Sequence, residues 1–224
     1  MITIPKLLGP DELQHITQRL AAEKFVDGGE TATGRAREVK HNLQMPMDGD
    51  ATKELDHLIR QAMDRHAVFM AAALPLHIVP LRFSRYEPGM TYGWHTDNPV
   101  MVGVARQAVR TDLACTIFLS DPAGYAGGEL ALRTPLGIVR IKLAAGDAVL
   151  YPATSVHQVD PVTQGVRTVA VTWIQSLVGG SDQRQLLMDL FEATRDLAMR
   201  DPMAPELERL GAVRHNLLRL WGQT

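Results

Sequence analysis

Hydrophobic side chains recur at helical spacing at both ends of the chain and form short runs in the middle. Apolar residues three or four positions apart predict four helices. The acidic residues Asp11 and Glu12 at the start of the first helix suit the positive end of a helix dipole. After a turn at Gly28-Gly29, residues 36–46 are expected to be extended. The predicted helices cover residues 10–24, 52–73, 186–197 and 207–220.

The apolar runs in the middle are separated by Gly, Pro and Asp. Short strands with regular turn signals are typical of an antiparallel sandwich or barrel. A doubly wound nucleotide-binding fold is disfavoured, because no helices separate the strands and the Gly-rich segment 124–128 lacks the dinucleotide-binding spacing. The predicted strands cover residues 78–83, 114–119, 129–132, 139–143, 148–151 and 168–174.

Together these elements predict an α+β protein in three parts. Residues 1–76 form an N-terminal support of helices and extended chain, residues 77–178 a strand-rich core, and residues 179–224 a C-terminal helical unit. A length of 224 residues suits one main domain with an appendage. The apolar faces of the C-terminal helices suit packing on the sheet or on another subunit in a homo-oligomer.

Charge and composition exclude several classes of protein. The formal net charge is −2 and the basic residues are scattered, so nothing indicates binding to nucleic acid or an anionic membrane. No apolar run approaches the roughly 20 residues of a membrane-spanning helix, and the start lacks a signal-peptide pattern, so a cytoplasmic protein is expected. The single cysteine, Cys115, lies in an apolar run, which excludes an internal disulfide and predicts a small buried residue.

One set of residues has the chemistry of a metal site. His95 and Asp97 are two positions apart, so in an extended segment their side chains share a face. A His-x-acid pair arises about once by chance in a chain of this composition, and alone it favours a surface pair. His157 lies between two predicted strands, where it can point into a sandwich. Two histidines and one carboxylate form the facial triad of non-haem iron(II), whereas structural zinc prefers a closed four-ligand shell.

Arg167 begins the last predicted strand, ten residues after His157. A guanidinium there can bind the distal end of a dicarboxylate with two hydrogen bonds. Alone, it would be interpreted as an exposed cation at a strand edge. Tyr92 and Trp94 are expected near the mouth of the same pocket or in packing, and His66 and His77 in core or interface packing. The loop 98–110 predicts a partly apolar rim.

A series of motifs over nearly the whole chain resembles the bacterial PKHD-type hydroxylases, the PiuC/YbiX family in the prolyl 4-hydroxylase-like branch of the iron(II)- and 2-oxoglutarate-dependent dioxygenases. The motifs are RY at 85–86, TYGWHTD at 91–97, RTDL at 110–113, FLSDP at 118–122, GGEL at 127–130, AGD at 145–147, LYP at 150–152, PVTQGVR at 161–167, WIQS at 173–176 and HNLLR at 215–219.

The resemblance implies a double-stranded β-helix, or jelly roll, with helices packed outside. It places the iron(II) ligands at His95, Asp97 and His157 and the anchor for 2-oxoglutarate at Arg167. It also implies a contact from Tyr86 to the same co-substrate, although a buried core tyrosine explains Tyr86 nearly as well. Collagen-type prolyl hydroxylases use lysine as the anchor, so a collagen-like peptide substrate is not implied.

The implied activity is hydroxylation, by O2, of an unidentified small molecule or peptide side chain, with release of succinate and CO2. Ascorbate is the implied auxiliary reductant, and the family suggests a link to iron uptake and siderophore metabolism. Two alternatives stay open. One is a cupin-like hydrolase or isomerase with zinc or manganese, which would not need Arg167. The other is an iron- or ligand-sensing module that acts without turnover through its helical tail.

Overall fold

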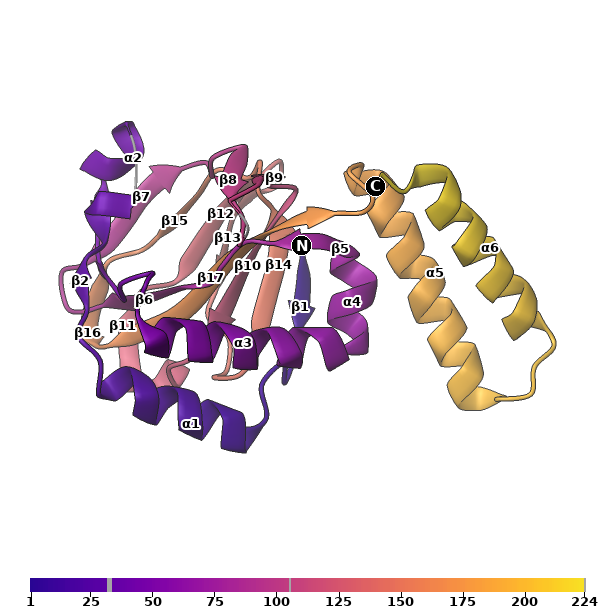
Figure 1. Ribbon diagram of the computed structural model, residues 1–224, viewed down its shortest axis with the longest axis horizontal. Coiled ribbons are helices and arrows are strands. Elements are labelled where there is room, and N and C mark those ends of the chain that lie inside the picture. Colours follow the sequence, from indigo (N-terminus) through magenta and orange to yellow (C-terminus); the bar gives the residue numbers. More distant parts are fainter. Residues whose placement is uncertain (32–33, 105, 224) are drawn as a thin grey trace.

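The computed structural model describes residues 1–31, 34–104 and 106–223. Two antiparallel sheets face each other, helices from the N-terminal part cover the outer face of the larger sheet, and a C-terminal helical hairpin extends to one side (Figure 1). The helices are α1 (Pro10–Ala21), α2 (Arg35–Glu38), α3 (Asp50–Arg65), α4 (Ala67–Ala73), α5 (Ser181–Arg200) and α6 (Glu206–Trp221), with short 3-10 helices η1 (Gly28–Thr31) and η2 (Pro122–Gly124).

The larger sheet contains, in spatial order, β1 (Ile2–Ile4), β14 (Ala148–Pro152), β10 (Leu113–Phe118), β17 (Arg167–Ser176), β6 (Arg82–Tyr86), β4 (Leu43–Gln44) and β2 (Val26–Asp27), and β5 (Pro75–Ile78) also pairs with β17. The smaller sheet contains β13 (Gly137–Ile141), β12 (Leu130–Thr134), β15 (His157–Val159), β7 (Thr91–His95) and β3 (Lys40–His41). Two further strand pairs join β11 (Tyr125–Gly127) to β16 (Val162–Gly165) and β8 (Val100–Val102) to β9 (Ala108–Arg110).

The central strand β10 shows why this sequence forms a two-layer structure. Its side chains alternate: Cys115 and Ile117 belong to the core under the helices, whereas Ala114 and Phe118 belong to the core between the sheets. A strand buried on both faces needs a continuous apolar run, which this segment has. Burial of each large aliphatic or aromatic side chain stabilises the fold by roughly 1.5–3 kcal/mol.

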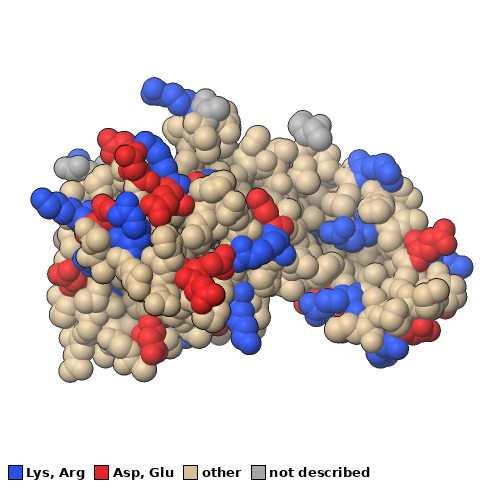
Figure 2. Space-filling view, turned by 60° about the horizontal axis from the view of Figure 1, so that its bottom comes forward, with Lys and Arg blue, Asp and Glu red and all other residues tan. Residues whose placement is uncertain are grey.

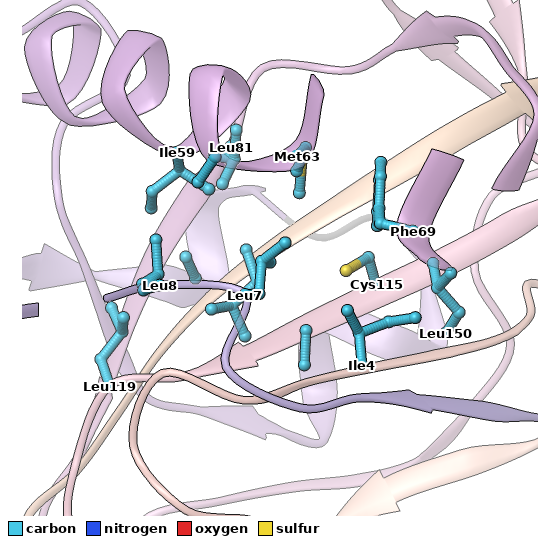
Figure 3. Close-up of a cluster of buried hydrophobic side chains, with 14 of the residues drawn as sticks. Ile4, Leu7, Leu8, Ile59, Met63, Phe69, Leu81, Cys115, Leu119 and Leu150 are labelled. Carbon is cyan, nitrogen blue, oxygen red and sulfur yellow. The ribbon is translucent and has the colours of Figure 1, made fainter. Parts of the chain in front are cut away.

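The core under the helices fixes the outer layer of the fold. Figure 3 shows Ile59 and Met63 of α3 and Phe69 of α4 packed over the sheet, close to Cys115 and Ile4. All of these side chains are buried, and burial raises the pKa of the Cys115 thiol to about 12. The prediction of a small buried cysteine is confirmed.

The helix predicted over 52–73 is wrong in one respect, because the chain forms two helices with a break at His66. The His66 backbone is extended, and its Nδ1 accepts a hydrogen bond from the Phe69 N–H at 3.3 Å, which caps α4. Leu74, in the left-handed conformation, then ends α4. His66 is therefore a capping residue, and His77 is exposed, so neither packs in the core of this chain.

Residues 36–46 were predicted to be extended. In the structure, this segment begins in a short helix and continues as two short strands that belong to different sheets. α2 ends at Glu38, β3 pairs with β7 of the smaller sheet, and β4 pairs with β6 of the larger sheet. Asn42 stands between β3 and β4, where the chain crosses from one sheet to the other. The side chains of Lys40, Asn42 and Gln44 are all buried, as expected for alternate residues of an extended chain with one face inward.

The C-terminal hairpin has a small core of its own. Leu187 of α5 is buried with Leu74 and Val178, and Leu217 and Trp221 of α6 pack against them. No described residue of α6 is itself buried. On the face seen in Figure 2, acidic and basic side chains are intermixed. None of the helices in the described part of the chain is long and apolar enough to cross a membrane.

Candidate metal and co-substrate site

The register of two strands brings the three predicted metal ligands together. His95 is the last residue of β7, and His157, the first of β15, lies directly opposite it. Asp97 follows two residues after the strand end. One ligand atom from each of the three residues lies within 4.8 Å of the others, and Asp97 Oδ1 is 3.9 Å from His157 Nε2. These three side chains, hereafter the triad, can hold one metal ion.

Backbone carbonyls orient both imidazoles of the triad. His95 Nδ1 lies 2.8 Å from the Gly93 carbonyl oxygen, and His157 Nδ1 lies 3.0 Å from that of Ser155. We assign the ring proton to Nδ1 in each case, since a carbonyl only accepts, which leaves Nε2 free to bind a metal. Burial lowers the pKa of His95 to about 3, with a further contribution from His157. His95 is therefore neutral at physiological pH, as a metal ligand must be.

Asp97 supplies the observation that tests whether a cation fits. Its Oδ2 atom is buried and has no hydrogen-bond partner among the described residues. Burial raises the pKa of the Asp97 carboxyl group, and His157 opposes that rise. A buried carboxylate oxygen without a partner is costly in free energy, and a cation held between it and the two imidazoles removes that cost. The donor set of two imidazoles and one carboxylate fits iron(II).

A β-bulge in β7 places a further aromatic ring beside the triad. His95 pairs with His157, and Tyr92 pairs with Val159. Tyr92 is three residues from His95, whereas Val159 is only two residues from His157, so β7 contains one extra residue. Tyr92 and His95 therefore lie on the same side, with stacked ring centroids 3.6 Å apart. Of the two positions considered for these residues, pocket and packing, Tyr92 occupies the pocket, whereas the Trp94 ring packs with its centroid 4.4 Å from the Arg133 guanidinium carbon.

Arg167, the predicted anchor for 2-oxoglutarate, lines the same pocket as the triad. It begins β17, pairs in register with Tyr86 of β6, and its side chain is 1% exposed. Its Nε and Nη1 atoms have no hydrogen-bond partner among the described residues. The guanidinium carbon lies 5.1 Å from the Tyr86 ring centroid and 5.7 Å from that of Phe118. A buried, unpaired guanidinium needs an anion, and a carboxylate matches its donor geometry.

Two residues around Arg167 were not singled out individually from sequence. The Tyr125 hydroxyl is buried beside Arg167, whose charge and hydrogen-bonding group partly offset the rise that burial causes in the pKa of Tyr125. Gly128 has φ +70°, and a Cβ there would lie 3.0 Å from Arg167 Cδ and 2.9 Å from Val162 Cγ2. Gly128 therefore gives Arg167 its space, which explains the paired glycines of the GGEL motif.

The triad, Arg167 and Tyr86 line one pocket between the two sheets, with an empty volume of about 820 Å³ that includes its open mouth. Met101 of the predicted rim also lines it, whereas Val100 and Val102 are exposed. Residue 105 of that rim lies outside the described residues.

Sequence reasoning missed one polar side of this pocket. Lys40, Asn42 and Gln44 line it from β3 and β4, and Arg82 and Ser84 line it from β6. Within each of these two groups the residues are two positions apart, and in an extended segment this spacing puts their side chains on one face. That spacing was the sequence signal that could have identified them. The signal was too weak to use, because polar residues at this spacing usually mark a solvated face.

Comparison with known proteins agrees with this geometry. The 2OG-Fe(II) oxygenase superfamily matches residues 81–175, and the PKHD-type hydroxylase C-terminal domain matches residues 182–223. A PKHD-type hydroxylase of Delftia acidovorans is 44% identical over 225 residues, which cover 100% of this chain and 99% of the relative. The PKHD-type hydroxylase PiuC of Pseudomonas aeruginosa is 41% identical over 100% of this chain and 99% of its own length.

The fold is also found among solved structures. A prolyl hydroxylase of Trichoplax adhaerens, in complex with a hypoxia inducible factor peptide fragment, superposes with a TM-score of 0.56 at 17% identity. The match covers 83% of this chain and 86% of that protein, and it confirms the jelly-roll fold. Full-length identity above 40% to several relatives shows the family. The chain therefore belongs to the PKHD-type hydroxylases, a family of 2OG-Fe(II) oxygenases whose cofactors are iron(II) and 2-oxoglutarate.

Proposed function

We propose that His95, Asp97 and His157 hold the iron(II) and that Arg167 binds the distal carboxylate of 2-oxoglutarate. The observation that carries this proposal is the pairing, in one pocket, of a three-ligand cluster with a buried guanidinium that has no anionic partner among the described residues. Tyr86, opposite Arg167 in register, is the proposed second contact to the co-substrate. The enzyme then hydroxylates its substrate with release of succinate and CO2.

When bound, iron(II) and 2-oxoglutarate supply the oxidising chemistry that uses O2 to convert a substrate C–H group to C–OH. The residues of the chain supply geometry. Hydrogen bonds to the Gly93 and Ser155 carbonyls hold the imidazoles with Nε2 inward. Arg167 orients the co-substrate by a directional pair of hydrogen bonds, and Tyr86 and Phe118 shield that pair from water.

The two alternatives fit the pocket less well. A cupin-like hydrolase or isomerase gives no function to Arg167, whose burial without an anion is costly. A sensor without turnover is disfavoured because the relatives are hydroxylases. From the resemblance alone, we place the substrate among the small molecules of iron uptake, siderophores included. The division of the chain after residues 76 and 178 stays a prediction.

We also propose that the C-terminal hairpin packs against a second copy of the chain. Large apolar side chains are exposed along α5 and α6, among them Leu186, Met199, Val213 and Leu220. Exposed apolar residues that are grouped on one unit mark an interaction surface. Light scattering on the purified protein tests this proposal: a multiple of 24.7 kDa is expected. A monomer at all concentrations would overturn it.

The test of the proposed reaction is succinate formation from 2-oxoglutarate by protein loaded with iron(II) without oxygen and then exposed to air, with and without ascorbate. Wild type should form succinate even without its substrate, His95→Ala should not, and Arg167→Ala should need far more 2-oxoglutarate. Arg200→Ala, on an exposed arginine at the end of α5, is the matched control and should behave as wild type. Iron-loaded wild type that neither binds nor consumes 2-oxoglutarate would favour the cupin-like alternative.

A further inference from the structure

The pocket of the triad contains two cations besides Arg167. Lys40 is 7% exposed, and its Nζ donates a hydrogen bond to Thr31 Oγ1 at 2.7 Å. Arg82 donates through Nη1 to the Thr31 carbonyl at 3.3 Å, and its buried Nε has no partner among the described residues. We call Lys40, Arg82 and Asn42 the basic wall. All three line the same pocket as the triad.

The basic wall has no counter-charge of its own. Within the described ranges, neither Lys40 nor Arg82 has a carboxylate oxygen within 4.0 Å. Asp27 and Asp97 act on them only from a longer distance. Burial lowers the pKa of Lys40 to about 8, and repulsion by Arg82 contributes to that decrease. Two neighbouring cations that are removed from water destabilise the pocket until an anion joins them.

Asn42 adds unused hydrogen-bonding capacity. Its side chain is 3% exposed, it lies near enough to the Tyr86 hydroxyl to lower the pKa of that group, and neither amide atom has a hydrogen bond of ordinary geometry among the residues the structure describes. Buried amides of folded proteins are nearly always fully paired, so one that keeps bonding capacity and lines a pocket points to a ligand. An amide N–H, an ammonium and a guanidinium are all donors, and together they suit a group that only accepts.

The wall is held in place before any ligand binds. Thr31 Oγ1 donates to Gln44 Oε1 at 2.6 Å, and Gln44 Nε2 donates to Ser84 Oγ at 3.0 Å. Thr31 thus joins Lys40 to a chain of hydrogen bonds that ends on β6, the strand of Arg82. A preformed set of donors binds an anion with little loss of conformational entropy.

The basic wall and Arg167 act on different parts of the pocket. Arg167 pairs with Tyr86 at the end of β6, whereas Arg82 begins β6 and pairs with Val171, so the two arginines lie at opposite ends of the same strand pair. Lys40 lies on β3 of the smaller sheet, with its Nζ atom 5.4 Å from the Tyr92 ring centroid. The distal carboxylate of 2-oxoglutarate needs only the Arg167 region, so the wall is left for a second anion beside the triad.

We infer that the substrate of this enzyme carries an anionic oxygen group, a carboxylate or a phosphate, which Lys40 and Arg82 bind beside the metal triad with the help of Asn42. This inference rests on the proposed function and specifies the substrate class of the same site. The bound anion removes the repulsion between the two cations and holds the reacting carbon of the substrate at a fixed distance from the triad.

The test uses full-length protein with iron(II) and saturating 2-oxoglutarate, without oxygen, so that Arg167 is occupied and no turnover takes place. Three probes of matched chain length are titrated by calorimetry: hexanoate, hexyl phosphate and hexanamide. At least one of the two anions should bind roughly tenfold or more tightly than the neutral amide, and which one does so distinguishes a carboxylate from a phosphate site. The preference should fall to about onefold in Lys40→Met and in Arg82→Met.

The controls separate this inference from the proposed function. Lys53→Met, on an exposed lysine of α3, should keep the wild-type preference. Lys40→Met and Arg82→Met should keep wild-type affinity for 2-oxoglutarate and wild-type iron content. An amide that binds as well as both anions, an absence of binding by all probes, or a parallel loss of 2-oxoglutarate affinity in both wall variants would overturn the inference. Failure of wild type to bind 2-oxoglutarate would instead overturn the proposed function.

Discussion

The two cationic regions of the pocket are built differently. Arg167 lies at the start of a ten-residue strand in the interior of the larger sheet, and its neighbours Tyr86 and Phe118 are aromatic. Lys40 lies on a two-residue strand next to the point where the chain changes sheets, in a wall of polar side chains. One region is a single cation in an apolar site, and the other is a group of donors.

This difference matches the two ligands that the regions are proposed to bind. A co-substrate common to a whole family needs one orientation, which a strand in the sheet interior fixes. A substrate particular to one enzyme is recognised by segments that vary without disturbing the core, and the short edge strand of Lys40 meets that requirement, whereas Arg82 lies on the interior strand β6. The first variant below affects both regions, each later one changes a single region, and the variants follow in order of decreasing expected effect.

Loss of a triad ligand should affect both regions at once. His157→Ala removes the imidazole that faces His95 directly across two paired strands. Iron(II) affinity should fall by more than about 100-fold, since even an outer partner of a metal ligand is worth 10–100-fold. Equilibrium dialysis against iron(II) without oxygen measures this. His41→Ala, at the exposed residue next to Lys40, is the control, and equal loss in both variants would contradict the assignment.

Replacement of Arg167 should affect only the co-substrate region. Arg167→Met removes both donors of a buried pair with a carboxylate, so the dissociation constant for 2-oxoglutarate should rise on the order of 100-fold. Arg167→Lys should retain part of the affinity, because it keeps the charge but loses the forked geometry. Calorimetry distinguishes these outcomes. Equal affinity in wild type and Arg167→Met would place the co-substrate elsewhere.

Gly128→Ala should weaken the Arg167 region indirectly. The new Cβ would lie 3.0 Å from Arg167 Cδ in a backbone with φ +70°, so the arginine must move and the backbone is strained. Affinity for 2-oxoglutarate should fall by roughly tenfold and stability by about 1–2 kcal/mol. Gly137→Ala, with φ +120° and open space around its Cβ, should lose stability but keep its affinity. Unchanged affinity in Gly128→Ala would show that Arg167 tolerates the contact.

The smallest expected effect is a pH-dependent difference in the free energy of unfolding between wild type and a variant of the basic wall, Lys40→Met. Burial and Arg82 hold the pKa of Lys40 at about 8, below the 10.5 of a lysine in water. Between pH 8 and pH 10.5 the unfolded chain therefore binds more protons than the folded chain. The buried Lys40 cation destabilises the fold fully below pH 8, and this destabilisation is lost above pH 10.5. Lys40→Met should be more stable than wild type by about 2 kcal/mol near pH 7, with a smaller difference at pH 10.

Urea unfolding at several pH values measures the Lys40→Met difference, with Lys53→Met as the control that should show no such trend. Asp27 and Arg82 are the charged groups that act on Lys40, and both are unchanged in the variant. A difference that stays constant from pH 7 to pH 10 would mean that Lys40 is not buried as a cation.

Sequence patterns identified the parts of the site that depend on long strands and motifs. Arg167 was placed at the start of its strand from the apolar run that follows it, and Tyr86 was placed on a neighbouring strand by the family resemblance. The break at His66 was not identified, since the apolar period continues through it. The bulge that turns Tyr92 toward His95 was also missed, because it depends on pairing with β15 rather than on local sequence.

The basic wall shows the limit of pattern reasoning most clearly. Lys40, Asn42 and Gln44 are polar, and polar residues in a short segment are normally exposed. They are buried only because the chain crosses between the two sheets there. That crossing is a property of the tertiary fold. Residue spacing and the family resemblance therefore predicted the metal ligands and the co-substrate anchor, whereas the candidate substrate contacts required the structure.

The most direct test of the account is an anaerobic titration of the iron(II)-loaded protein with 2-oxoglutarate, followed by visible absorption, because a 2-oxo acid bound to iron(II) gives a charge-transfer band. Wild type should develop the band with saturation at low 2-oxoglutarate, Arg167→Met only at far higher concentration, and His95→Ala not at all. Wild type that retains iron(II) but develops no band at any 2-oxoglutarate concentration would contradict the proposed site.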